Sequence, residues 1–319
     1  MVLKEASDKG AEMRYPGKLE AGATVGLICP SSPISEDRMV KCINAIQQLG
    51  YKVKAADNLT ENYAGFMAGD GEVRAKWINA MFADPEVDAI FCVRGGYAGN
   101  RAMEYLDLDV IRANPKIFVG YSDVTSMHIA INKGCDLVTF HGPMVSSNIV
   151  DKFDDLTRKS FFKALSAEAP FEFKNPDEHE IKVLREGKAS GELTGGNLAI
   201  LTASIGTSYE VDTKGKILFI EEVGETISRI DRMLYQLRNS GKLRDCAGII
   251  LGQFTDCPNE EVPQYTEIEC LNDILRDIDV PVMYNIQSGH DHPMMTLPLG
   301  AVCTMDTFSR TIVFEAPER

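Results

Sequence analysis

The chain alternates, up to about residue 145, between short apolar runs and longer segments with helical spacing, and no other feature limits the fold as strongly. Short apolar runs bounded by turn residues are typical of buried strands, and a 3.6-residue apolar period is typical of helices. Strands joined by crossover helices form a parallel sheet that binds ligands at the carboxyl ends of its strands. The sequence therefore predicts an α/β fold, with a Rossmann-like parallel-sheet domain over residues 1–165. The expected strands are Thr24–Cys29, Tyr51–Ala55, Ala89–Val93, Ile117–Val119 and Leu137–Phe140, and the expected helices are Ser35–Leu49 (with Ser35 as N-cap and Gly50 as its end), Glu72–Phe82, Asn100–Leu106 and Val124–Ile131.

The alternation stops near Ser146. Residues 146–187 are rich in charge, contain Pro170 and Pro176 and show no long period, so we expect a connector with short elements, assigned to residues 166–190. Short strands dominate the end of the chain, which predicts a β-rich, barrel-like C-terminal domain over residues 191–319. The expected elements there are a turn into a helix over Gly191–Gly206, helices over Thr226–Asn239 and Glu267–Asp277, and strands over Lys216–Glu221, Gly248–Phe254, Val280–Ile286, Ala301–Met305 and Thr311–Phe314.

Charge and composition limit the partners of the chain. It carries 33 Lys and Arg against 47 Asp and Glu, a formal net charge of −14. This balance argues against nucleic acid or an anionic membrane surface as a partner and fits a small substrate. The first twenty residues or so contain no apolar signal region, and no apolar run is long enough to span a membrane. The eight cysteines form no C-x-x-C pair and several lie in apolar runs, so we expect reduced core cysteines and a cytoplasmic location.

The segment from Ile117 to Thr125 runs from an apolar strand through Gly-Tyr-Ser-Asp into a helical pattern. A side chain at such a turn is exposed at the carboxyl edge of the sheet, beside the free N–H groups of a helix start. Ser122 is therefore placed to act as a nucleophile, although Val124 stands where the G-x-S-x-G elbow of esterases has glycine. On these residues alone, capping of the helix by Ser122 and Asp123 is the commoner alternative.

A glycine-rich turn, Arg94 to Arg101, follows the expected strand Ala89–Val93. Such a turn brings backbone N–H groups close to a ligand, as a site for an oxyanion or phosphate requires. The turn fits neither G-x-G-x-x-G nor the P-loop, which argues against phosphate. Stabilisation of an anion and a tight turn without a ligand both remain open.

Two later features offer an acid and a base. The apolar run Ile217–Ile220 ends in Glu221 and Glu222, whose side chains point to opposite faces of a strand. The loop that follows Val280–Ile286 contains His290 and His292, which can supply a general base. A His-x-His pair can also bind zinc, but no further cluster of ligands accompanies it, so we expect no metal.

A hydroxyl, an acid and a histidine thus occur in that order, which is the set that acyl transfer requires. The histidine accepts the hydroxyl proton, the acid fixes the imidazole tautomer, and N–H donors hold the tetrahedral oxyanion. The glycine-rich turn and the helix start after Ser122 are the expected sources of those donors. This chemistry needs no cofactor.

The chain resembles the LD-carboxypeptidase family of serine peptidases, which includes the microcin C immunity proteins. The motifs that carry the resemblance occur in the right order along most of the chain: Pro30-Ser31-Ser32-Pro33, Arg94-Gly95-Gly96-Tyr97, Gly120-Tyr121-Ser122-Asp123, His141-Gly142-Pro143-Met144, Gly195-Gly196-Asn197-Leu198, Ile220-Glu221-Glu222, Arg229-Ile230-Asp231-Arg232-Met233-Leu234, Gly289-His290 and Thr296-Leu297-Pro298-Leu299-Gly300. The resemblance implies an N-terminal α/β domain with the nucleophile, a C-terminal β-rich domain with the acid and base, and a homodimer. It implies further that Ser122 is the nucleophile, Glu221 the acid and His290 the base, and that the N–H groups of Gly96 and Asp123 form the oxyanion hole.

The sequence departs from the family pattern at two places. Tyr97-Ala98-Gly99 stands where the family commonly has Tyr-Gly, which leaves the geometry of this turn open. Glu222 stands where the family usually has Asp, which leaves a choice between the two glutamates that the register of the motif decides for Glu221.

The resemblance implies a peptide substrate and leaves three functions to compare. The first is a cytoplasmic carboxypeptidase that removes the terminal D-alanine from murein tetrapeptides, for which Arg94 and Arg232 are candidates to bind the substrate carboxylate. The second is a microcin C immunity-type peptidase that cleaves a peptidyl or aminoacyl nucleotide. The single tryptophan, Trp77, lies in an expected helix far in sequence from the catalytic loops, and the loop 183–187 carries no aromatic residue, which disfavours a stacked base. The third is a catalytically inactive binding protein.

Overall fold

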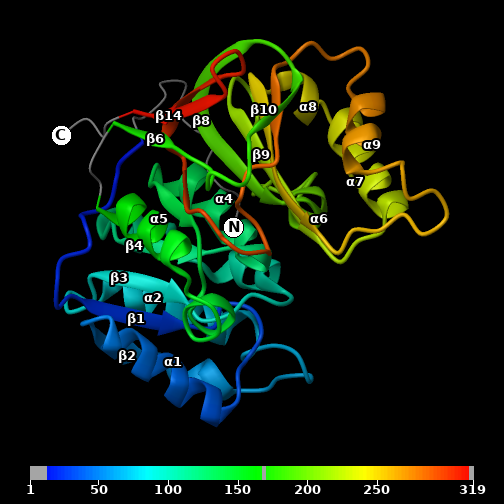
Figure 1. The fold of residues 1–319 in the computed structure, drawn as a ribbon. Coiled ribbons are helices and arrows are strands. Elements are labelled where there is room, and N and C mark those ends of the chain that lie inside the picture. Colours follow the sequence, from blue (N-terminus) through cyan, green and yellow to red (C-terminus); the bar gives the residue numbers. More distant parts are fainter. Residues whose placement is uncertain (1–12, 167–169, 316–319) are drawn as a thin grey trace. The chain divides into compact units, whose positions relative to one another are not determined.

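The computed structural model describes residues 13–166 and 170–315, which divide into two units. The first unit runs to residue 166 and also includes Thr296–Pro298, and the second holds the remaining described residues (Figure 1). Residues 1–12 of the N-terminal segment, 167–169 of the expected connector and 316–319 lie outside the described residues. None of the described helices is long and apolar enough to cross a membrane.

The first unit is built on a six-stranded sheet with the strand order β12-β5-β4-β3-β1-β2. All five expected strands are present, and the pairs β1–β2, β1–β3, β3–β4 and β4–β5 are parallel. The N-terminal parallel sheet is therefore confirmed. The strands are β1 (Thr24–Ile28), β2 (Lys52–Ala55), β3 (Ala89–Cys92), β4 (Ile117–Gly120), β5 (Thr139–His141) and, from late in the chain, β12 (Leu297–Leu299).

Crossover helices connect these strands, largely where the apolar period predicts them. The Ser35 hydroxyl caps the first helix by accepting the Arg38 N–H at 3.3 Å, and Gly50 (φ +91°) follows its end. The expected helix Asn100–Leu106 is a 3-10 helix rather than an α-helix. The helical elements are α1 (Glu36–Gln48), η1 (Asp57–Thr60), α2 (Gly71–Ala83), η2 (Gly99–Tyr105), α3 (Leu108–Ala113), η3 (Ser122–Val124), α4 (Thr125–Cys135), the π-helix η4 (Val145–Ile149) and α5 (Asp155–Leu165).

Helix α5 corrects the expectation that residues 146–187 lack a long element. Its N-cap Asp154 accepts the N–H groups of Leu156 and Thr157 at 3.1 and 3.0 Å. Its buried face consists of Thr157, Phe161, Ala164 and Leu165, which follows the helical period. Charged residues on the opposite face hide this period when the segment is read as a whole.

The second unit is an eight-stranded sheet with the order β6-β14-β13-β8-β9-β10-β11-β7. Its central strands β8, β9, β10 and β11 are parallel, and the outer pairs are antiparallel. The first halves of β9 and β10 contain the buried apolar runs Ile217–Ile220 and Ile249–Leu251, as is usual in parallel strands that are covered on both faces. The strands are β6 (Phe171–Phe173), β7 (Lys182–Arg185), β8 (Lys188–Asn197), β9 (Ile217–Val223), β10 (Gly248–Thr255), β11 (Val282–Tyr284), β13 (Val302–Asp306) and β14 (Thr311–Phe314), and the helices are α6 (Leu198–Ala203), α7 (Ile227–Asn239), α8 (Lys242–Asp245) and α9 (Glu267–Ile274).

Two sequence expectations for this unit need correction. The described part of the segment 166–190, expected to be a connector, contributes β6 and β7 to the sheet. The stretch expected to turn at Gly191 is instead the long strand β8. A Cβ at Gly195 would lie 2.0 Å from the Phe219 carbonyl oxygen, so this glycine marks a close approach of two backbones within a sheet.

Candidate active site

Ser122 stands at the turn between β4 and the helical segment that η3 and α4 form. Its backbone adopts φ +64°, in the left-handed region that residues other than glycine rarely occupy. The side chain is partly exposed, whereas Tyr121 and Asp123 on either side are buried. A strained residue that presents a hydroxyl at a strand-to-helix turn is the geometry of a nucleophile elbow. This conformation favours the nucleophile over the capping alternative, since the Ser122 side chain caps neither η3 nor α4.

The glycine-rich turn after β3 lies against Ser122. A Cβ placed on Gly95 would lie 3.1 Å from the Ser122 Cβ and 3.4 Å from its Oγ. Gly96 has φ +120°, and a Cβ there would lie 2.1 Å from the Ser32 Oγ. The turn therefore needs glycine at both positions, one for the approach to Ser122 and one for its backbone conformation.

One peptide group of this turn is held from both sides by buried charges. The Ala98 carbonyl accepts a hydrogen bond from the Arg74 guanidinium at 2.7 Å, and the N–H of the same peptide, on Gly99, donates to the Asp123 carboxylate at 2.7 Å. Arg74 is 0% and Asp123 4% exposed. Burial raises the pKa of Asp123, while its hydrogen bonds and the charge of Arg74 oppose that change. Asp123 therefore fixes the turn rather than capping α4 as the sequence suggests.

Arg74 also ties this peptide to two other loops. Its guanidinium donates to the carbonyl of Pro30, after β1, at 3.0 Å, and to the carbonyl of Asp70, the N-cap of α2, at 3.0 Å. Three backbone segments at the carboxyl edge of the sheet thus share one buried cation. We call Arg74, Asp123 and the Ala98–Gly99 peptide the turn clamp.

A buried histidine supports the strand that ends in Ser122. Burial lowers the pKa of His128 to about 4, so the ring is neutral at pH 7. Its Nε2 lies 2.9 Å from the Gly120 carbonyl, which can only accept, and its Nδ1 lies 2.8 Å from the Thr139 hydroxyl. The ring therefore donates from Nε2 to the last residue of β4 and accepts from Thr139.

In the second unit, Glu221 and His290 form a hydrogen-bonded pair. The His290 Nδ1 lies 2.7 Å from the Glu221 Oε2, and the Glu221 side chain is 0% exposed. Burial alone lowers the pKa of His290, but the charge and hydrogen bond of Glu221, with the charge of Glu222, more than reverse this and leave it raised. Because Nδ1 donates to the carboxylate, Nε2 of the neutral ring is left to accept a proton.

Glu222 has a different set of partners. Its carboxylate accepts from the Asn197 side chain at 2.9 Å and from the Ala199 and Val223 N–H groups at 2.8 Å each. It thereby fixes the start of α6. Of the two glutamates, Glu221 is the one hydrogen-bonded to His290.

The loop that carries His290 is anchored to β10. The Gln253 Oε1 accepts the Asp291 N–H at 3.0 Å, and the Gln253 N–H donates to the Ser288 carbonyl at 2.9 Å. The neighbouring His292 does not join a metal-binding group, since the described residues contain no cluster of three or more His, Cys, Asp and Glu side chains able to hold a metal.

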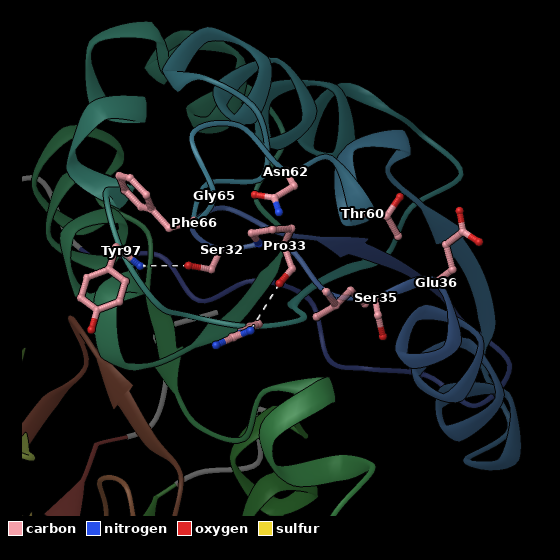
Figure 2. Close-up of a pocket in the computed structure, with 11 residues that line it drawn as sticks. Ser32, Pro33, Ser35, Glu36, Thr60, Asn62, Gly65, Phe66 and Tyr97 are labelled. Carbon is pink, nitrogen blue, oxygen red and sulfur yellow. Dashed lines mark hydrogen bonds between the residues drawn. The ribbon is translucent and has the colours of Figure 1, made fainter.

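The two candidates for binding a substrate carboxylate lie in different units. Arg94 is exposed and lines a cavity of about 590 Å³ in the first unit (Figure 2), where it donates to the Pro33 carbonyl at 3.4 Å. Arg232 is exposed on α7 in the second unit.

The structure therefore brings the predicted residues together in two sets. Ser122, Asp123, Gly96 and Arg94 gather at the carboxyl edge of the first sheet, and Glu221 and His290 pair in the second unit. Sequence reasoning missed Arg74, His128 and Gln253. A signal existed for Arg74, which is a charged residue on the same face of its helix as the apolar Ile78 and Phe82. Gln253, a polar residue near the end of a strand, offers no comparable signal.

Comparison with known proteins shows the family to which the chain belongs. Residues 25–142 match the LD-carboxypeptidase N-terminal domain, and residues 190–305 match the LD-carboxypeptidase C-terminal domain. The chain is 40% identical over 306 residues to the probable murein peptide carboxypeptidase of Bacillus subtilis (strain 168), covering 94% of each protein. It superposes on the structure of MccF in complex with glutamyl sulfamoyl guanosine with a TM-score of 0.88 at 26% identity, covering 96% of this chain and 99% of that one. It also superposes on a muramoyltetrapeptide carboxypeptidase from Oxalobacter formigenes with a TM-score of 0.81 at 26% identity, covering 93% and 99%. Both halves of the chain match, and it therefore belongs to the LD-carboxypeptidase family.

Proposed function

We propose that the chain is a serine carboxypeptidase that hydrolyses an L,D-peptide bond and releases the terminal D-alanine from murein tetrapeptides. The observation that carries the chemistry is the 2.7 Å hydrogen bond from His290 to the buried Glu221. This bond leaves the Nε2 of His290 as the only basic nitrogen of the neutral ring. The choice of substrate is supported by the 40% identity to a protein named a probable murein peptide carboxypeptidase.

In the proposed mechanism, Ser122 Oγ attacks the carbonyl carbon of the scissile bond while His290 Nε2 takes its proton. The Glu221 carboxylate stabilises the imidazolium that forms. The N–H groups of Gly96 and Asp123 donate to the oxyanion of the tetrahedral intermediate. His290 then returns the proton to the departing nitrogen, the C–N bond breaks, and D-alanine leaves an ester on Ser122.

A water molecule completes the reaction. His290 removes its proton as the oxygen attacks the ester carbon, and the proton passes to Ser122 Oγ when the ester breaks. This sequence requires Ser122 Oγ within hydrogen-bonding reach of His290 Nε2 in the enzyme–substrate complex. No metal or cofactor takes part in any step.

The proposal places the enzyme in the cytoplasm, in the recycling of cell-wall peptides. All eight cysteines are free thiols, and every one except Cys257 is buried, as in proteins of a reducing compartment. Burial raises the pKa of the Cys257 thiol as well, to about 11, so it carries little thiolate.

The assay is incubation of the purified protein with a murein tetrapeptide, followed by quantification of free D-alanine and of the tripeptide. We expect stoichiometric formation of both products, unaffected by a chelator. Well-folded protein that releases no D-alanine would disprove the assignment.

The alternative is a peptidase of the microcin C immunity type. The observation that favours it is the TM-score of 0.88 to MccF in complex with glutamyl sulfamoyl guanosine. Trp77 gives it no support, since this side chain lies on α2 with Lys76 over its ring. Cleavage of an aminoacyl sulfamoyl adenosine in preference to a murein tetrapeptide would establish this alternative.

A further inference from the structure

The cavity that Arg94 lines lies beside the proposed oxyanion turn. Its walls come from the loops after β1, β2 and β3, three adjacent strands of the first sheet. Ligands of open α/β sheets bind at this edge. The Ser32 N–H donates to the Gly95 carbonyl at 3.1 Å, and the Ser32 Oγ accepts the Tyr97 N–H at 3.3 Å (Figure 2). The cavity wall is therefore continuous with the turn that touches Ser122.

The cavity is larger than the leaving amino acid requires. Its volume of about 590 Å³ falls in the range of about 300–1,000 Å³ that is usual for small-ligand sites. A single alanine fills only a small part of such a space. The cavity therefore has room for the larger part of a peptide substrate, which stays attached to Ser122 in the proposed mechanism.

One wall of the cavity carries the guanidinium of Arg94. The chain contains 47 acidic residues, yet among those that the structure describes none lies within ion-pair distance of Arg94. Its recorded hydrogen bond, at 3.4 Å to the Pro33 carbonyl, engages one of five N–H donors. The remaining donors suit a carboxylate, which guanidinium binds through charge-assisted hydrogen bonds.

The rest of the lining is mixed in character. Phe66 and Tyr97 are 39% and 69% exposed and form an edge-to-face pair with ring centroids 6.5 Å apart. Figure 2 shows this pair at one end of the cavity and Thr60 and Glu36 at the other. The rings offer an apolar surface to an aliphatic chain, and the exposed Glu36 carboxylate favours a cationic group.

We propose that this cavity is the subsite for the acyl part of the peptide substrate, and that it selects an acyl part bearing a free carboxylate, bound by Arg94, and an ammonium group, bound by Glu36. The assignment rests on the proposed peptidase function. It gives Arg94 a role in selecting the retained part of the substrate rather than the departing D-alanine.

The test uses four matched tetrapeptides that end in the same D-alanine. Their acyl parts carry either a free carboxylate or its amide, and either a free amine or its acetyl derivative. We expect the wild-type protein to prefer the carboxylate over the amide by about tenfold or more in kcat/KM. Arg94→Gln is expected to remove this preference, because it should lower kcat/KM for the carboxylate peptides far more than for the amide peptides. Glu36→Gln is expected to remove the preference for the free amine.

Matched controls separate these effects from general changes in charge. Glu72→Gln removes an exposed carboxylate from the first turn of α2, as Glu36→Gln does in α1, and Arg158→Gln removes an exposed guanidinium outside the cavity. Both controls should keep the two preferences. The proposal is overturned if Arg94→Gln lowers kcat/KM equally for all four peptides, or if it leaves the carboxylate preference intact.

Binding to the Ser122→Ala protein keeps this test independent of turnover. Calorimetric titration with the same four peptides should show the same selectivity, which Ser122→Ala/Arg94→Gln should lose. If the wild-type protein releases no D-alanine but this selectivity is present, the proposed function fails and the subsite stands. If turnover occurs but neither assay shows selectivity, the subsite fails and the function stands.

Discussion

At the scale of single residues, the charge state of His290 sets the pH range in which the proposed reaction can run. Its pKa lies above the ordinary 6.5 because Glu221 outweighs the effect of burial. The base must be neutral to accept the Ser122 proton, so kcat/KM should rise with pH along an acid limb centred above 6.5. The same shift means that His290 stabilises the fold fully below its unfolded pKa, and that this contribution is lost as pH rises through the folded pKa.

Glu221→Gln tests this account. Without the negative charge the pKa of His290 falls, so the acid limb of kcat/KM should move to lower pH. The amide can also hold the wrong tautomer, so kcat should drop by about 10²- to 10⁴-fold. The comparison is Glu222→Gln, which alters the hydrogen bonds at the start of α6 and leaves the Glu221–His290 bond in place. A larger pH shift in Glu222→Gln than in Glu221→Gln would assign the acid to the wrong glutamate.

The backbone of Ser122 gives a second prediction. Both Ser122→Ala and Ser122→Gly remove the nucleophile, so each should lower kcat by about 10³-fold or more. Only glycine relieves the strain of φ +64°. Urea unfolding should therefore find Ser122→Gly more stable than Ser122→Ala by about 1 kcal/mol. Equal stability of the two variants would contradict the strained turn, and near-full activity of either would contradict the mechanism.

At the scale of elements, the sequence predicts best where one period dominates a segment. Strands β1, β3, β4 and β5 follow from their apolar runs, β2 follows from its short strand-like pattern, and α1 follows from its spacing and its Ser35 cap. Helix α5 is not predicted, because its few buried apolar residues alternate with many charged ones. Strand β8 is not predicted, because its glycines are typical of turns. Their role becomes clear only when the neighbouring strand is known.

The residues of the candidate site also differ in how well the sequence predicts them. Ser122, Glu221 and His290 are noticed in the sequence because their residue types suit acyl transfer. Ser122 follows β4, Glu221 lies in the second half of β9, and His290 lies in the loop after β11. The turn clamp cannot be predicted from the sequence, because it depends on hydrogen bonds from one side chain, Arg74, to backbone carbonyls. A sequence does not show which carbonyls a buried cation will contact. The capping role expected for the Asp123 carboxylate is wrong for the same reason, since this carboxylate accepts the Gly99 N–H instead.

The turn clamp yields a prediction at this scale. Arg74→Met removes the guanidinium that donates to the carbonyls of Pro30, Asp70 and Ala98, and it leaves the buried Asp123 without the positive charge that acts on it. The free energy of unfolding should therefore fall by about 3 kcal/mol or more. In the proposed mechanism the Gly96 N–H acts mainly in the transition state, so kcat should fall more than KM rises. Arg74→Lys, which keeps the charge but not the fork of donors, should restore stability in part and kcat little. A variant that unfolds more easily but keeps its kcat would confine Arg74 to a purely structural role.

At the scale of the whole molecule, the residues of the proposed triad come from two different units, Ser122 from the first and Glu221 with His290 from the second. Neither unit holds a nucleophile together with its base. The mechanism therefore predicts that residues from different units act together in one catalytic step. The effects of mutating such residues are strongly non-additive. Ser122→Ala/His290→Ala should lose no more activity than Ser122→Ala alone, because the base has no function without the nucleophile.

A binding residue should behave differently in the same experiment. Arg94 is proposed to act on substrate affinity, so the loss in kcat/KM from Arg94→Gln should multiply with that from His290→Ala. The rates are measured against the uncatalysed reaction, with the peptide that carries both the free carboxylate and the free amine. Losses from Ser122→Ala and His290→Ala that multiply would mean that the two units contribute independently. The serine mechanism proposed here would then be wrong, even with both side chains required for full activity.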